Sequence, residues 1–96
     1  MRLLPAEREI IRTLATRIFG DGTRVLLFGS RVDDSVKGGD IDLYVQSPDA
    51  EQALTKKREF VVALKLALGD QKIDVVISSN PSRFIEQEAL KHGVAL

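Results

Sequence analysis

The sequence predicts an α+β fold (mixed α/β): a small three-stranded mixed sheet with helices packed mainly on one face, leaving the other face free for a site. Three short apolar runs rich in strand-forming residues, at residues 24–28, 40–46 and 72–77, alternate with segments whose apolar positions recur at helical spacing. The chain has 96 residues, 44% hydrophobic and 29% charged, which is typical of one globular domain spanning residues 1–96. A sheet layer covered by helices buries such elements around one core.

The predicted fold begins with a helix and a buried strand. Apolar residues recur at helical spacing after Pro5, a natural first-turn residue, until Gly20 and Gly22 end the segment. The first apolar run, RVLLF, has turn residues on both sides, which is typical of a strand buried on both faces. This strand ends at Gly29.

Three further helical segments follow in the sequence. Residues 31–36 fit a short helix or helical turn between a Gly-Ser pair and a Gly-Gly pair. A long helix is predicted from Pro48 to Gly69, and a last helix opens near Asn80 and ends at Gly93. With the three strands between them, these helices predict the mixed sheet.

Acidic residues interrupt the second and third apolar runs. In the second run, DIDLYVQ, the side chains alternate, so Asp40, Asp42 and Tyr44 share one face. Asp74 interrupts the third run and would join the first two aspartates if the two strands pair side by side. We therefore expect three carboxylates to converge.

Three ionised carboxylates at one point repel one another unless a cation lies between them. Their oxygen atoms suit Mg²⁺ or Mn²⁺. Magnesium is typically held by one or two carboxylates together with water and substrate phosphates, so the pattern predicts a nucleotide as the other ligand. Gly29 and Ser30 offer a place for its phosphates, because glycine permits close backbone approach and helix N-termini attract anions.

These residues carry a resemblance to a known family. GSR at residues 29–31, DID at residues 40–42 and an aspartate in a later apolar strand look like the motifs of the minimal nucleotidyltransferase (MNT) family of the DNA polymerase beta-like nucleotidyltransferase superfamily, over about residues 10–80. The resemblance implies the nucleotidyltransferase fold. It also implies transfer of a nucleoside monophosphate from an NTP, usually ATP, to an acceptor hydroxyl, with release of pyrophosphate.

The resemblance assigns the nucleotide-binding residues. Gly29 and Ser30 match the triphosphate-binding pair of the family, and Arg31 stands where many members carry a basic residue, so we expect it to contact phosphate. The spacer VDDSVKGG after Arg31 is shorter and less rich in arginine than in many members.

The resemblance also assigns the metal-binding and catalytic residues. Asp40 and Asp42 match the two-carboxylate metal motif, and Asp74 matches the third acidic position, which assists deprotonation of the acceptor. A site with two Mg²⁺ ions, or Mn²⁺ in their place, would support in-line displacement at the α-phosphorus of ATP.

The resemblance further predicts a protein partner. Larger members of the superfamily add a second domain for the acceptor, and this chain ends soon after its last predicted helix, so we expect the acceptor site to come largely from elsewhere. In the family the missing part is frequently a separate helical protein of the HEPN type that forms a toxin–antitoxin pair with the MNT protein. We expect an antitoxin that transfers AMP to its HEPN-type partner, a protein adenylyltransferase. The alternatives are a non-catalytic module that neutralises or scaffolds a partner, and nucleotidylation of a small molecule.

Each motif also has an ordinary structural interpretation. A Gly-Ser pair after a strand commonly forms a turn and a helix cap, and charged residues on a strand face guard a sheet edge against pairing. Asp74 taken singly fits a solvent-facing strand residue. The combination and order of the three features favour the nucleotidyltransferase interpretation.

Composition excludes several classes of protein. Fourteen basic residues balance fourteen acidic ones, which disfavours bulk nucleic-acid binding, and the absence of cysteine excludes disulfides and thiolate chemistry. The N-terminal sequence has no apolar stretch long enough for a signal peptide or membrane span, so we expect a cytoplasmic protein without membrane contact.

Several questions stay open from the sequence. Tyr44 suits either the pocket or ordinary packing, and the basic turn of Lys56, Lys57 and Arg58 is typical of a solvated helix face. His92 receives no chemical role. The sequence leaves open the nucleobase, the acceptor residue and the oligomeric state, including a homo-oligomer.

Overall fold

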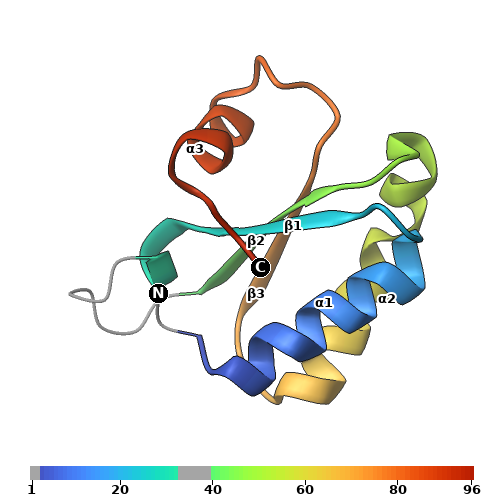
Figure 1. The fold of residues 1–96 in the computed structure, drawn as a ribbon, viewed down its shortest axis with the longest axis vertical. Helices are drawn as coiled ribbons and strands as arrows, with labels where there is room; N and C mark the ends of the chain where they lie inside the picture. The colour runs from blue at the N-terminus through green and yellow to red at the C-terminus, as the bar shows by residue number, and fades with distance from the viewer. Residues whose placement is uncertain (1–2, 33–39) are drawn as a thin grey trace.

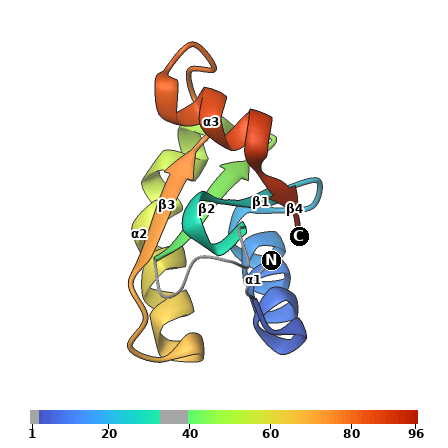
Figure 2. The same cartoon turned by 90° about the vertical axis from the view of Figure 1, so that its left-hand side faces the viewer.

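A computed structural model describes residues 3–32 and 40–96, with the side chain of Ser30 outside the description. Two long helices cover one face of a mixed sheet and a shorter helix covers part of the other (Figure 1, Figure 2). The elements in chain order are α1 (Pro5–Phe19), β1 (Arg24–Phe28), the 3₁₀ helix η1 (Gly29–Val32), β2 (Ile41–Gln46), α2 (Ala50–Leu68), β3 (Ile73–Ile77), α3 (Phe84–His92) and β4 (Val94–Ala95).

The sheet has the strand order β3-β2-β1-β4. Strand β1 runs antiparallel to both β2 and β4, whereas β2 and β3 are parallel and are joined by α2. The three predicted strands are confirmed. The fourth strand is an addition to the predicted three-stranded sheet, and its two residues are too few to form a readable strand pattern.

The helix ends show how local sequence sets the boundaries. The side chain of Asp49 caps α2 by accepting a hydrogen bond from the backbone N–H of Gln52. The last helix begins later than predicted, at Phe84, because Asn80 Oδ1 accepts hydrogen bonds from both the backbone N–H and the hydroxyl of Ser82 and holds this segment in a turn. Of the predicted short helix at residues 31–36, residues 33–36 lie outside the described part of the chain.

Alternation along the strands divides the buried side chains between two cores. Most buried apolar residues face α1 and α2 and form the main core. On the other face, a smaller core includes Leu26, Phe28, Tyr44 and Ala89. The expectation of a free sheet face is therefore wrong in part, because α3 covers the large apolar side chains that the strands present there.

Within the described residues, no helix combines the length and the apolar character that crossing a membrane requires.

Candidate metal centre

Asp40, Asp42 and Asp74 come together on the face of the sheet that carries α3. The parallel register places Asp42 directly beside Asp74, and Asp40 precedes Asp42 by two residues and therefore points to the same side. One carboxylate oxygen from each residue lies within 4.8 Å of the others. The convergence predicted from the sequence is confirmed.

The electrostatics of the cluster are unfavourable without a cation. Burial raises the pKa of Asp42 above its ordinary value of 3.8, and the charges of Asp74 and then Asp40 raise it further, while Lys72 acts in the opposite direction. Lys72 Nζ lies 3.6 Å from Asp40 Oδ2, but both side chains are exposed, so this ion pair offsets little of the repulsion.

The donor set fits a hard divalent cation. All three donors are carboxylate oxygens, the ligand type that Mg²⁺ and Mn²⁺ prefer. Oxygen ligands of an octahedral Mg²⁺ are about 3 Å apart when adjacent and about 4.2 Å apart when opposite, since each bond is about 2.1 Å long. The three carboxylate oxygens lie within 4.8 Å of one another, so side-chain rotations that bring them closer together would let these residues hold the ion.

Gly29 lies against the cluster and has no room for a side chain. It directly follows Phe28, the β1 residue that pairs with Asp42, and its φ of 77° is in the region that favours glycine. A Cβ atom at this position would collide with Asp42 Oδ2. The glycine therefore permits the backbone of η1 to approach the carboxylates.

The other two predicted nucleotide-binding residues follow in η1. The backbone of Ser30 belongs to this helix, and its predicted hydroxyl contact lies outside the described part of the chain. The guanidinium of Arg31 donates to Gln71 Oε1 at 3.1 Å, and Gln71 Nε2 donates to Glu7 Oε2 at 2.9 Å. Arg31 thereby connects η1 to the segment before β3.

Tyr44 shares the strand face of Asp42 but is completely buried. Its hydroxyl lies 2.8 Å from Ser78 Oγ and donates to Glu86 Oε1 at 2.9 Å. Burial raises the pKa of Tyr44 above 10, so the hydroxyl keeps its proton. Of the two roles left open by the sequence, the packing role fits this environment.

Glu86 is a buried charged residue that sequence reasoning missed. Its carboxylate also accepts hydrogen bonds from the backbone N–H groups of Ser79 and Asn80 at 3.2 and 2.9 Å, and Arg83 Nη1 lies 3.7 Å away. An acidic residue in the first turn of a helix can be recognised from the sequence. Its contact with Tyr44, 42 residues earlier in the chain, cannot be predicted from a local pattern. Glu86 thus links the first turn of α3 to the segment that follows β3.

The remaining charged residues singled out in the sequence lie elsewhere. Lys57 and Arg58 are exposed on α2 and Lys56 is half-buried there, as expected for a largely solvated face. His92 Nε2 lies 3.5 Å from Glu88 Oε2 on the surface of α3.

Comparisons with known proteins find a similar fold among solved structures. No family model matches the chain, and no curated protein does. Among solved structures, the chain is similar to a chain of the toxin–antitoxin MntA–HpeT, crystallised as a mutant with glutamate at two aspartate positions. The identity is 23%, the match covers 93% of this chain and 70% of that chain, and the TM-score is 0.66. This likeness confirms the predicted fold class, an α+β fold with a small mixed sheet, which the two chains share.

Proposed function

We propose that this chain is a Mg²⁺-dependent nucleotidyltransferase of the MNT type that transfers AMP from ATP to an acceptor hydroxyl on a HEPN-type partner protein and acts as an antitoxin. The observation that carries this proposal is the convergence of Asp40, Asp42 and Asp74 beside the side-chain-free Gly29. A charged face at a sheet edge would not require three carboxylates to meet at one point, because like charges disfavour such an arrangement.

Asp40, Asp42 and Asp74 would hold the cation, Mg²⁺ or Mn²⁺, and a second ion would need the phosphates of ATP as further ligands. A bound dication would neutralise charge on the triphosphate and make the acceptor hydroxyl more acidic. Gly29 and Ser30 would receive the triphosphate along their backbone, and Arg31 would contact a phosphate from η1.

The reaction places different demands on the three carboxylates. The acceptor oxygen forms a bond to the α-phosphorus of ATP, and the bond from that phosphorus to the bridging oxygen breaks, releasing pyrophosphate. Asp74 is the most exposed member of the cluster, so an incoming acceptor can reach it, and its carboxylate would receive the hydroxyl proton. Asp42 is half-buried and lies against Gly29, which suits a fixed metal ligand.

Two observations support a protein partner. The solved chain with the shared fold comes from a toxin–antitoxin structure, and its mutated aspartates stand two positions apart, the same spacing as Asp40 and Asp42. Helix α2 also exposes three large apolar side chains, Leu54, Val62 and Leu66, which a partner surface could cover.

Intact-mass spectrometry of a co-expressed HEPN-type partner tests the proposal. We expect the partner to gain the mass of AMP after incubation with this chain, ATP and Mg²⁺, and to gain nothing with Asp42→Asn. No added mass with either chain would contradict nucleotidyl transfer. An Asp42→Asn chain that still neutralises the toxin would favour the non-catalytic binding module instead.

A further inference from the structure

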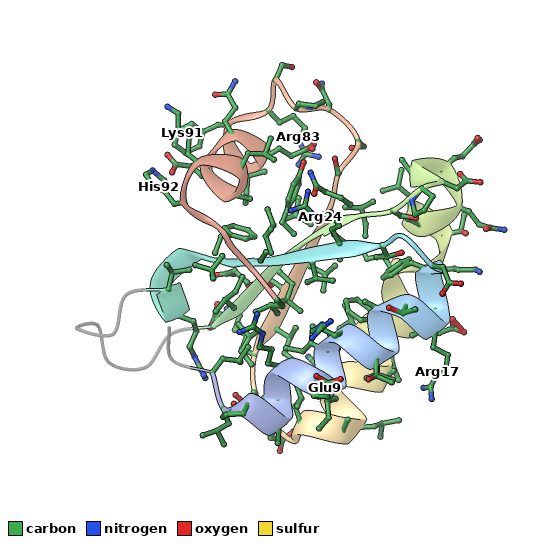
Figure 3. All side chains as sticks on the ribbon, in the orientation of Figure 1. Glu9, Arg17, Arg24, Arg83, Lys91 and His92 are labelled. Carbon is green, nitrogen blue, oxygen red and sulfur yellow. The ribbon has the colours of Figure 1, made fainter. Side chains whose placement is uncertain are left out.

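A cavity of about 420 Å³ opens next to the carboxylate cluster, between the end of β1 and α3. Its lining residues are Phe28, Gly29, Phe84, Ile85, Glu88 and His92. Figure 3 shows His92 on α3, on the side of the molecule where η1 lies. Gly29 belongs to the wall of this cavity and also lies against Asp42, so the cavity and the cluster adjoin at this residue.

We propose that this cavity binds the base of the nucleotide whose phosphates lie at the carboxylate cluster, an inference that rests on the proposed function. The volume is within the range of small-ligand pockets, about 300–1,000 Å³. A nucleotide has its base and its phosphates at opposite ends, which matches an apolar cavity joined to a metal site through a residue without a side chain.

The lining has the chemistry that a base requires. Phe84 is 75% exposed at the start of α3, although burial of a large aromatic side chain is energetically favourable. A planar base stacked on the Phe84 ring would bury one of its faces. At the rim, the carboxylate of Glu88 can only accept hydrogen bonds, so it favours a base edge with N–H groups, such as the amino group of adenine.

The backbone around Phe84 is held by buried contacts of Glu86. Phe84 and Ile85 lie between Arg83, the N-cap of α3, and Glu86. Since the carboxylate of Glu86 is held by Tyr44 and by backbone N–H groups after β3, the first turn of α3 cannot shift without breaking these bonds. The backbone that carries this wall of the cavity is therefore in place before a ligand arrives, which lowers the ordering cost of binding.

Calorimetric titration with MgATP and with magnesium tripolyphosphate tests the inference, because the second ligand has phosphates and no base. We expect Phe84→Ala to weaken MgATP binding about fivefold or more and to leave tripolyphosphate binding within about twofold. Leu90→Ala is the matched control, since Leu90 is exposed on the same helix and does not line the cavity. It should alter neither affinity.

A second variant reports on the base directly. The chain contains no tryptophan, so Phe84→Trp introduces a single indole. We expect MgATP to quench its fluorescence and magnesium tripolyphosphate to leave it unchanged. This readout also serves if Phe84→Ala fails to fold.

The outcomes separate the two proposals. Equal effects of Phe84→Ala on both ligands, or no effect on either together with no quenching, would overturn the base site while leaving the phosphate site intact, as expected if a partner side chain fills the cavity. If the natural chain binds neither ligand with Mg²⁺ present, the proposed function fails and the base site fails with it.

Discussion

At the scale of single residues, the proposed chemistry needs an ionised Asp42, whereas the stability of the cation-free fold favours a protonated one. Burial and the neighbouring carboxylates raise its pKa above 3.8. Because the folded pKa exceeds the unfolded one, this group stabilises the protein fully below pH 3.8, and the contribution is lost as the pH rises through the folded pKa. At neutral pH without a cation, an ionised Asp42 therefore destabilises the fold, by an amount that partial solvent exposure limits.

Replacing Asp42 by asparagine should therefore stabilise the cation-free protein. We expect Asp42→Asn to raise the Tm at pH 7 in EDTA by about 2–4 °C, and the difference to vanish near pH 3. Calorimetric scans at both pH values measure this change. Asp21→Asn is the control, because Asp21 is exposed in the loop before β1, at the end away from the cluster. A lower Tm for Asp42→Asn at pH 7 would contradict the predicted repulsion.

A comparison of Gly29 with Gly69 separates two effects of a substitution: strain in the backbone and a collision at the metal site. Gly29→Ala introduces both a strained positive φ and a collision with Asp42, whereas Gly69→Ala introduces strain at a φ of 84° in open space. We expect both variants to lose about 1–3 kcal/mol in urea unfolding, and Gly29→Ala alone to lose Mn²⁺ binding in a calorimetric titration. Equal Mn²⁺ affinities for the two variants would show that Gly29 does not shape the site.

At the scale of elements, a buried hydrogen bond joins α3 to the central strands of the sheet. The Tyr44 hydroxyl of β2 donates to Glu86 of α3, and both side chains are completely buried. A hydrogen bond to a buried charged group contributes more than one between neutral groups. This contact therefore couples the first turn of α3 to the middle of the sheet.

Removal of the Tyr44 hydroxyl should loosen α3 selectively. We expect Tyr44→Phe to lower the free energy of unfolding by about 1–3 kcal/mol and to speed amide hydrogen exchange in α3 more than in α1. Ser78→Ala, which removes the neutral neighbour of the same hydroxyl, should have a smaller effect. Equal destabilisation by the two variants, or unchanged exchange in α3, would contradict this role.

Sequence patterns predicted the elements better than their contacts. Period-two alternation placed Asp42 and Tyr44 on one strand face, and turn residues bounded β1, because both signals depend on neighbours in the chain. The start of α3 was placed too early, since the Asn80 turn competes with the helix signal of the same residues. Strand β4 forms only through pairing with β1, which no local pattern reports.

At the scale of the whole molecule, the site is a product of the mixed sheet. Parallel pairing of β2 with β3 brings Asp74 beside Asp42, and antiparallel pairing of β1 with β2 brings Gly29 against the same carboxylate. The sequence supplied the residue types and their faces. It could not supply strand order, register or the cavity at α3, because these depend on contacts between residues far apart in the chain.

Label transfer tests the central claim, that this sheet assembles a nucleotidyl-transfer site, most directly. The HEPN-type partner is incubated with Mg²⁺ and either α-³²P-ATP or γ-³²P-ATP, using the natural chain, Asp42→Asn and the control Asp21→Asn. The account predicts partner label from the α position only, with the natural chain and Asp21→Asn and not with Asp42→Asn. Label from the γ position, or equal α-label with Asp42→Asn, would contradict it.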